Sequence, residues 1–341
     1  CYKKLNMSKK NSNVNLKNVF KDFKDLSNIF LNFKKKLNKL NKKSYVIGVS
    51  GGPDSLALVA LTKAYSYEKK IKFYYVLINH NIRKNSGKEA KQVKNLLKKN
   101  KIILKIISNK KKISRNIQGQ ARNIRYKMLA NFCKAKKSNT ILTAHNLEDQ
   151  VETFFIRLSR GSGLTGLSAM KPLSKLASNV KLYRPLLDVK KISLKKISTY
   201  SFGKYFKDPS NINQKYLRTK IRNLKGPLKK SGIEYEQIVK SINNLASSKA
   251  TLEAYFKKIF KEIIKTSKKE IIINLKKFKV LNNEAKISVI NESIKKLMKN
   301  YYNPRYKKVE TLIKNIEKTN FKKSTLAGCL FVKRDDKLCL K

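Results

Sequence analysis

The sequence predicts a doubly wound α/β domain built on a parallel sheet, followed by a smaller, mainly helical C-terminal domain. Between residues 45 and 143, short continuous apolar runs alternate with longer helical segments. These runs are rich in Val, Ile, Leu and Tyr at consecutive positions, the pattern of strands buried on both faces of a parallel sheet. The alternation stops near Gly226 and Pro227, and helical segments dominate beyond that point.

The elements of the first domain follow from this alternation. Buried strands are expected at 45–49, 71–78, 102–107 and 140–143, and helices at 55–67, 86–100 and 117–137. Before them, residues 16–40 place apolar side chains at steps of three and four, which predicts one amphipathic helix packed on the following domain. We assign 16–226 to the first domain and 1–15 to a disordered tail. Because the chain opens at Cys1 and Met7 offers a start, residues 1–6 are expected not to be native coding sequence.

The second domain is expected at 228–341. It is predicted to hold one long basic helix at 233–265, a short strand at 271–274 and helices at 284–299 and 304–318. The last residues, 325–340, place Arg334, Asp335 and Asp336 between two apolar runs, which predicts a terminal hairpin.

Charge is the most extreme feature of the composition. The 341 residues contain 81 Lys and Arg against 21 Asp and Glu, a net charge of +60, and yet 41% of the chain is hydrophobic. That apolar content is enough for a buried core and excludes a purely disordered polycation. A polycation gains affinity for nucleic acids by counterion release, but compositional drift toward Lys accounts for the excess equally well. Nine of the eleven arginines lie between Arg83 and Arg222, where a planar bidentate donor would have a use.

Cysteine usage and hydropathy bear on the compartment. The four cysteines form no CxxC pair, so a reducing, cytoplasmic location is expected, and two histidines do not complete a zinc site. No uninterrupted apolar run reaches the roughly 18 residues needed to span a bilayer, so we expect no membrane association. Residues 1–43 also lack the apolar block of a signal peptide.

The strongest local signal is the run SGGPDS at 50–55, directly after an expected strand and before an expected helix. Such a loop points backbone N–H groups and the positive end of a helix at one place, which suits a phosphate. Its glycines permit close approach, its two serines add hydroxyl donors, and Asp54 is placed to hold a magnesium ion that accompanies a nucleotide.

Two other loop types were compared with this run. A Walker A loop requires a Lys followed by Ser or Thr, which is absent here. A nucleophile elbow is formally satisfied by GVSGG at 48–52, but the only triad partners are Asp54, in the same turn, and His145, and there is no HGGG-type segment. The phosphate-binding interpretation is therefore favoured.

The run SGGPDS resembles the pyrophosphate loop SGGxDS of the N-type ATP pyrophosphatases, the PP-loop superfamily. Further segments follow in the order seen in the tRNA(Ile)-lysidine synthetase family: NHNIR (79–83), QARNIRY (120–126), AHNLEDQVET (144–153), RLSRGSGLTGL (157–167), YRPLL (183–187), DPSN (208–211), and then Arg218 and Arg222. The resemblance covers 45–226 closely and the region from 228 more loosely.

The resemblance implies a PP-loop, Rossmann-like fold and a two-step reaction. In that family ATP adenylates the oxygen at carbon 2 of the wobble cytidine of tRNA(Ile) with a CAU anticodon, and pyrophosphate leaves. The ε-amine of free L-lysine then displaces AMP to give lysidine. ATP, Mg²⁺, L-lysine and this tRNA are therefore the expected substrates, cofactor and partners, with 228–341 gripping the tRNA. Monomer and homodimer both stay open.

The resemblance also implies roles for particular residues. The ATP-binding residues would be Ser50, Gly51, Gly52, Pro53, Asp54, Ser55 and His145, with Asp54 also the magnesium ligand. Lysine would be held by Asp149 and Glu152, three apart on an expected helix, and by Arg218 and Arg222, four apart on the next basic helix. The catalytic set would be Asp54, Arg122, Arg125, Asp149 and Arg222, with Arg122 and Arg125 three apart on one helix face.

Two positions depart from the family pattern, and two rival functions share part of it. Asn146 stands where the family usually has a second His, and Glu148 where it usually has the first Asp, which leaves the roles of both open. A tRNA thiolase shares the loop but depends on cysteines, and here Cys133 is alone in its region. A noncatalytic RNA-binding protein would explain the charge but would leave the loop and the acids without a purpose.

Overall fold

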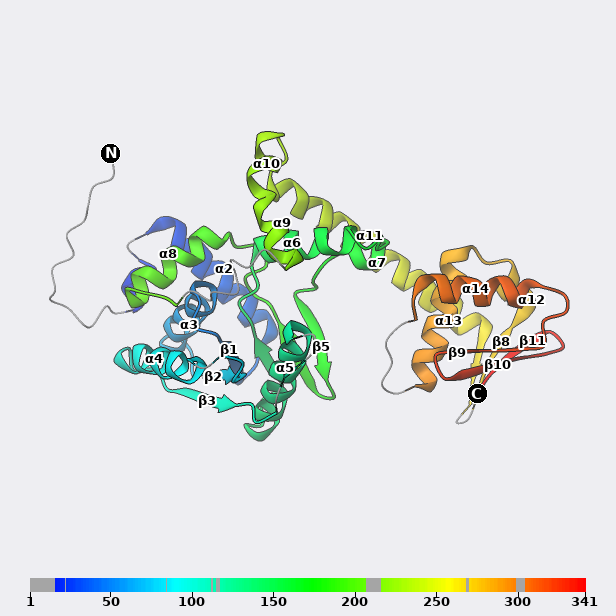
Figure 1. The fold of residues 1–341 in the computed structure, drawn as a ribbon, viewed down its shortest axis with the longest axis horizontal. Coiled ribbons are helices and arrows are strands. Elements are labelled where there is room, and N and C mark those ends of the chain that lie inside the picture. Colours follow the sequence, from blue (N-terminus) through cyan, green and yellow to red (C-terminus); the bar gives the residue numbers. More distant parts are fainter. Residues whose placement is uncertain are drawn as a thin grey trace. The chain divides into compact units, whose positions relative to one another are not determined.

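The computed structural model describes residues 16–21, 23–83, 85–111, 113–114, 117–206, 216–267, 270–298 and 304–341. The expected tail at 1–15 and the DPSN motif at 208–211 lie outside these ranges. The chain divides into two compact units, residues 1–244 and 245–341, and each is described by itself (Figure 1). The domain limits predicted from the sequence, 16–226 and 228–341, stay a prediction.

The first unit is built on a six-stranded sheet with the order β3-β2-β1-β4-β6-β5. Its strands are β1 Ser44–Val49, β2 Lys72–Asn79, β3 Leu104–Ser108, β4 Thr140–Leu142, β5 Leu173–Ala177 and β6 Val180–Tyr183. All neighbours pair in parallel except β5 and β6, which are antiparallel at one edge. Because the chain order reverses between β1 and β4, the carboxyl ends of these two strands form the switch point where such folds bind ligands.

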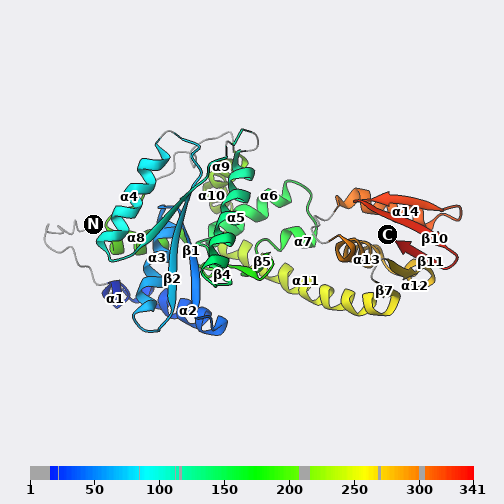
Figure 2. The ribbon, with the colours of Figure 1, turned by 90° about the horizontal axis from the view of Figure 1, so that it is seen from below.

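Helices cover both faces of this sheet (Figure 2). Helices α2 (Lys24–Leu40), α3 (Pro53–Ser66), α4 (Ser86–Lys99) and α8 (Lys191–Phe202) contribute to the core on one face. Helix α5 (Ile117–Ala135) packs on the other. Alternation along β1 serves both faces, because Tyr45 and Ile47 enter the first core and Val46 enters the second. The sheet is therefore buried on both sides, as its continuous apolar strands predict.

The expected doubly wound fold is confirmed, and the four expected strands and three expected helices occur with ends shifted by at most two residues. Strand β6 and the edge strand β5 were not predicted, since both are short and contain polar residues. Four further helices carry or flank the site: α6 (Leu147–Leu158), α7 (Leu164–Leu167), α9 (Leu217–Asn223) and α10 (Lys225–Lys230).

The single helix expected at 16–40 is wrong. The chain forms α1 (Leu16–Val19) and then α2, which starts at Lys24. Leu16, Val19 and Phe20 nevertheless enter the same core as Leu26 and the later apolar residues of α2. The apolar spacing therefore runs through the break, because both pieces face one core, and periodicity alone does not detect the bend.

The C-terminal unit contains the expected helices and, in addition, a five-stranded antiparallel sheet with the order β7-β8-β11-β10-β9. Its strands are β7 Ile264–Thr266, β8 Ile271–Asn274, β9 Lys323–Leu326, β10 Cys329–Arg334 and β11 Lys337–Leu340. The expected hairpin is the β10–β11 pair. Helix α11 (Tyr235–Ile263) leads into this unit, which also holds α12 (Leu275–Lys279), α13 (Asn283–Leu297) and α14 (Tyr306–Glu317).

None of the helices in the described part of the chain combines the length and the apolar composition that crossing a bilayer requires.

Candidate active site

The loop at 50–55 lies between the carboxyl end of β1 and the start of α3. Gly52 is the N-cap of α3 and Pro53 is in its first turn, so Asp54 also stands in that turn. The Ser55 hydroxyl accepts hydrogen bonds from the Ser50 backbone N–H at 3.2 Å and the Ser50 hydroxyl at 3.1 Å, and donates to the Gly52 carbonyl at 3.0 Å. The loop is thus closed on itself around one hydroxyl group, next to the positive end of a buried helix.

Gly51 makes the tight turn of this loop possible. Its φ is +84°, and a Cβ atom placed on it would lie 2.5 Å from Cγ2 of Val93 on α4. Its carbonyl accepts a hydrogen bond from the Phe206 backbone N–H at 3.0 Å. Both the backbone conformation and the close approach of α4 require glycine at this position.

Asp54 is the charged group of the loop. Burial raises its pKa to about 6, the Lys191 ammonium opposes that rise, and the carboxylates of Asp149 and Glu148 add to it. Its Oδ1 atom is buried and has no hydrogen-bond partner among the described residues. A hard oxygen ligand without a protein partner fits Mg²⁺, which usually takes one or two carboxylates together with substrate phosphates. The described residues contain no group of three acids, histidines or cysteines that could hold a metal ion by themselves.

The residues after β4 face the loop from the adjacent strand. The His145 Nδ1 atom lies 2.9 Å from the Thr143 hydroxyl, and burial lowers the pKa of His145 to about 4, so the ring is neutral at pH 7. Asn146 is the N-cap of α6: its side-chain oxygen accepts the Asp149 N–H at 3.0 Å, and the Asp149 carboxylate accepts the Asn146 N–H at 3.1 Å. Asn146 therefore replaces a histidine of the family pattern with an effective helix cap.

Helix α6 and helices α9 and α10 are joined by a series of ion pairs, here called the α6–α9 ladder. Glu152 pairs with Arg222 through two hydrogen bonds, of 2.6 and 3.2 Å, and its Oε2 lies 2.8 Å from the Arg218 Nε. One helical turn closer to the N-terminus of α6, Glu148 pairs with Lys225 at 3.2 Å. The Glu152 side chain is only 3% exposed, so its charge depends on these two guanidinium groups.

The geometry of the ladder follows from helical spacing. Glu148 and Glu152 are four apart on α6, while Arg222 and Lys225 are three apart on consecutive short helices, so each pair shares a face. Asp149 lies beside the ladder, with its Oδ1 4.0 Å from the Arg218 Nη2 and a side chain that is 19% exposed. The structure thus brings together the four residues that the sequence assigned to lysine binding.

A cavity of about 300 Å³ lies beside the ladder. Its walls are the loop residue Pro53, the ladder residues Glu148, Glu152, Arg222 and Lys225, the α8 residues Lys191, Ile192 and Lys195, and Tyr235 of α11. Tyr235 also packs with Leu147 and Val151 of α6 in a small apolar core. The cavity therefore joins the phosphate-suited loop to the acidic and basic residues of the ladder.

Arg122 and Arg125 are exposed on α5, which packs on the face of the sheet opposite to α3. Arg125 Nε lies 3.4 Å from Nε2 of His80, which follows β2, and the Arg122 guanidinium lies over the Tyr126 ring at 5.0 Å. Burial, and secondarily Arg125, lowers the pKa of His80 to about 4. Arg122 also contributes to the low pKa of His145, so its positive charge acts on the residues after β4.

Several residues at this site were not predicted from the sequence. Lys191 and Lys225 line the cavity but stand among seventy lysines and in no motif. Tyr235 closes the cavity from a helix that the sequence assigned to the second domain. In the sequence, Glu148 stands out only as a departure from the family pattern. The signal that identifies all four is spatial, because each contacts an element distant in the sequence.

The fold and the loop together define the class of protein. A model of the PP-loop domain matches residues 26–227, which include the whole sheet of the first unit, most of helix α2 and helices α3 to α9. A solved U34-tRNA thiolase from Methanococcus maripaludis has the same fold, with a TM-score of 0.56 and 20% identity over 67% of this chain and 79% of that one. The first unit is therefore a PP-loop domain.

Curated relatives narrow the class. The chain is 33% identical over 288 residues to the tRNA(Ile)-lysidine synthase of Wolbachia pipientis wMel, which covers 83% of this chain and 67% of the relative. It is 41% identical over 181 residues to the same enzyme of Orientia tsutsugamushi, covering 52% of this chain and 40% of the relative. The chain belongs to the tRNA(Ile)-lysidine synthase family.

Proposed function

We propose that this protein forms lysidine at the wobble cytidine of a tRNA(Ile) with a CAU anticodon, using ATP and free L-lysine. It is an ATP-dependent ligase that forms a carbon–nitrogen bond. The observation that carries the assignment of the site is the junction of the loop at 50–55 with the α6–α9 ladder across one cavity. The loop suits the phosphates of a nucleotide, and the adjacent acids and arginines suit the charged groups of an amino acid, so the two ligands would bind side by side.

In the first step, the oxygen at carbon 2 of the cytidine attacks the α-phosphorus of ATP. The bond from that phosphorus to the bridging oxygen breaks, and pyrophosphate leaves with the electron pair. Backbone N–H groups at the start of α3 and the hydroxyl of Ser50 would bind the departing pyrophosphate. Asp54 would hold Mg²⁺, which neutralises phosphate charge when bound. Neutral His145 lies at the next strand end, where it would contact the nucleotide.

In the second step, the ε-amine of lysine attacks carbon 2, the carbon–oxygen bond breaks, and AMP leaves with the transferred oxygen. Arg218 and Arg222 would bind the α-carboxylate of lysine, and Asp149 its α-amine. Glu152 pairs with both arginines, so it would fix their orientation as well as contribute negative charge to the α-amine. Arg122 and Arg125 would contact phosphate or the activated base from α5.

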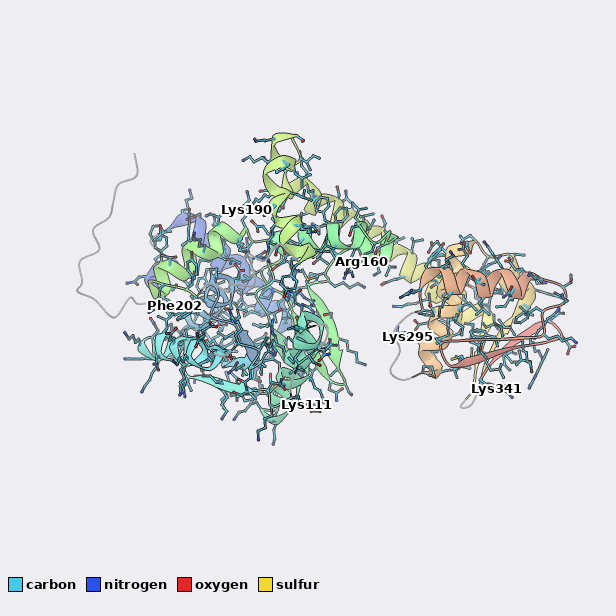
Figure 3. All side chains as sticks on the ribbon, viewed as in Figure 1. Lys111, Arg160, Lys190, Phe202, Lys295 and Lys341 are labelled. Atoms are coloured by element: carbon cyan, nitrogen blue, oxygen red, sulfur yellow. The ribbon has the colours of Figure 1, made fainter. Side chains whose placement is uncertain are left out.

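The tRNA would be bound largely through its phosphates. Lysines recur along the sequence of both units, and Figure 3 labels Lys111 and Lys190 in the first unit and Lys295 and Lys341 in the C-terminal one. We propose that the C-terminal region grips the body of the tRNA while the first unit acts on the anticodon. A cytoplasmic location is proposed on the same grounds, because the substrates are there.

The loop assignment is tested by replacing Asp54. We expect Asp54→Ala to reduce the release of pyrophosphate from ATP, measured in the presence of lysine and a CAU-anticodon transcript, by at least about 100-fold, because one preorganised charge at a transition state has effects of that order. Asp188→Ala removes an exposed carboxylate that pairs with Lys36 and serves as the matched control. Wild-type turnover in Asp54→Ala would refute this placement of the site.

A further inference from the structure

Helix α8 brings a lysine to the cavity that none of the roles proposed so far includes. Lys191 is the first residue of α8, it is half-buried, and it lines the cavity together with Pro53 of the loop and Arg222 of the ladder. Lys190, the N-cap of this helix, has no side chain that caps the helix start. The first N–H groups of α8 therefore need acceptors from elsewhere in the fold.

Glu148 on α6 supplies that acceptor. Its Oε2 accepts the backbone N–H of Lys191 at 2.8 Å, and its Oε1 pairs with the Lys225 ammonium at 3.2 Å. Glu148 is a buried residue, 9% exposed, so its carboxylate is held in one place by these partners. One buried carboxylate thus ties the first turn of α6 to the start of α8 and to α10, and it fixes the backbone from which the Lys191 side chain extends.

Lys191 acts electrostatically on Asp54, yet no ion pair joins its ammonium to a carboxylate of the described residues. Two nearby lysines do have carboxylate partners. The ammonium of Lys190, the N-cap, pairs with Glu236, and the ammonium of Lys196 on α8 pairs with Asp25. Over the described ranges of the chain, no carboxylate lies within ion-pair distance of the Lys191 ammonium. Among the charges acting on Asp54, Lys191 has the largest effect, and it lowers the pKa of that carboxyl. A cation that makes no ion pair among the described residues therefore lines the cavity beside the loop that suits a phosphate.

We propose that Lys191 is a catalytic residue that contacts the β- and γ-phosphates of ATP, and that Glu148 is the positioning residue that holds it there. This inference rests on the proposed function of the loop. As the bond between the α-phosphorus and the bridging oxygen breaks, the electron pair passes to the departing pyrophosphate. The Lys191 ammonium stabilises that charge together with the helix start of α3. Glu148 touches no substrate and acts through the backbone of Lys191.

Inorganic pyrophosphate is the probe that tests this contact without requiring the full reaction. Its binding to the full-length protein is measured by calorimetry in the presence of Mg²⁺, for the wild type and for Lys191→Met, Lys191→Arg and Lys196→Met. We expect Lys191→Met to weaken binding at least 10-fold, Lys191→Arg to restore most of it, and Lys196→Met to leave it unchanged. Lys196 is the matched control because it lies on the same helix and pairs with Asp25 instead. Equal affinity in Lys191→Met and the wild type would overturn the proposal.

Steady-state kinetics separate the two roles. Lys191→Met should lower kcat with little change in the KM for lysine, whereas Glu148→Gln, which keeps an oxygen acceptor for the Lys191 N–H, should retain more activity than Glu148→Ala. Equal loss in both Glu148 variants would overturn its positioning role. A wild type that fails to bind pyrophosphate would overturn the loop assignment together with this inference. A wild type that binds pyrophosphate through Lys191 but forms no lysidine would contradict the proposed function alone.

Discussion

Gly51 and Gly52 are adjacent in the loop, but they differ in what an added methyl group would meet. At Gly51 the backbone is left-handed and a Cβ would lie 2.5 Å from Val93 Cγ2; at Gly52 the nearest atoms would be 3.7 and 4.0 Å away. We expect Gly51→Ala to lose at least about 1–2 kcal/mol of folding free energy from the backbone conformation alone. Gly52→Ala, the matched control, should fold with nearly wild-type stability. Urea denaturation measures both, and equal stability of the two variants would contradict the assigned geometry.

The pKa of Asp54 gives the reaction a pH dependence. Because burial raises this pKa to about 6, the carboxylate is ionised above pH 6 and protonated below it. We expect kcat/KM for ATP to fall as the pH drops through about 6, since the protonated acid binds Mg²⁺ poorly. His145→Gln should keep this acidic limb, because the pKa of His145 is about 4 and its ring stays neutral across the range. Loss of the limb in His145→Gln would assign it to the histidine instead.

Among single residues, the sequence pattern predicted those of the loop at 50–55 but not the roles of the residues around it, such as Lys191 and Asn146. The run at 50–55 is local, so its position between a strand and a helix could be predicted from apolar periodicity. Lys191 could not, because its contact with Glu148 joins residues 43 positions apart and its residue type is the commonest in the chain. Asn146 could be recognised as a departure from the family pattern, but its capping role depends on where α6 begins.

At the scale of elements, the α6–α9 ladder decides how the lysine site is held. We expect Glu152→Gln to raise the KM for lysine at least 10-fold, because Arg218 and Arg222 would then repel each other with no buried carboxylate between them. The loss of stability should be about 1–3 kcal/mol, less than for a fully buried pair, because both arginines are partly exposed to solvent. Steady-state kinetics measure the KM for lysine, and urea denaturation measures the loss of stability.

A surface pair provides the control for this prediction. Glu68 pairs with Lys34 at 2.8 Å but is 42% exposed, so Glu68→Gln should cost less than about 1 kcal/mol and leave the KM for lysine unchanged. If Glu152→Gln behaved like Glu68→Gln, the ladder would not be the lysine site.

The elements themselves were largely predictable because one physical signal, burial on both sheet faces, repeats in each strand. The break between α1 and α2 was not, since both helices direct apolar residues into the same core. The sheet of the C-terminal unit was recognised only at residues 271–274 and in the last hairpin. Strands β7 and β9 are three and four residues long and are rich in polar side chains, so they lack a periodic signal.

At the scale of the whole molecule, the net charge of +60 is best interpreted by asking where the few acidic residues lie. Acids are few, and four of them, Asp54, Glu148, Asp149 and Glu152, gather around one cavity and its loop. Lysines suit the phosphates of a nucleic acid, whereas the site needs Asp54 for a metal ion and Asp149 and Glu152 for an amine.

Mass spectrometry of the tRNA tests the central claim most directly. The protein is incubated with ATP, Mg²⁺, L-lysine and a tRNA(Ile) transcript with a CAU anticodon, and the nucleosides are then analysed. We predict a wobble cytidine that is heavier by one lysine less one water, formed together with stoichiometric AMP and pyrophosphate and absent when lysine or ATP is omitted. An unmodified cytidine, or pyrophosphate release without lysine incorporation, would contradict the account.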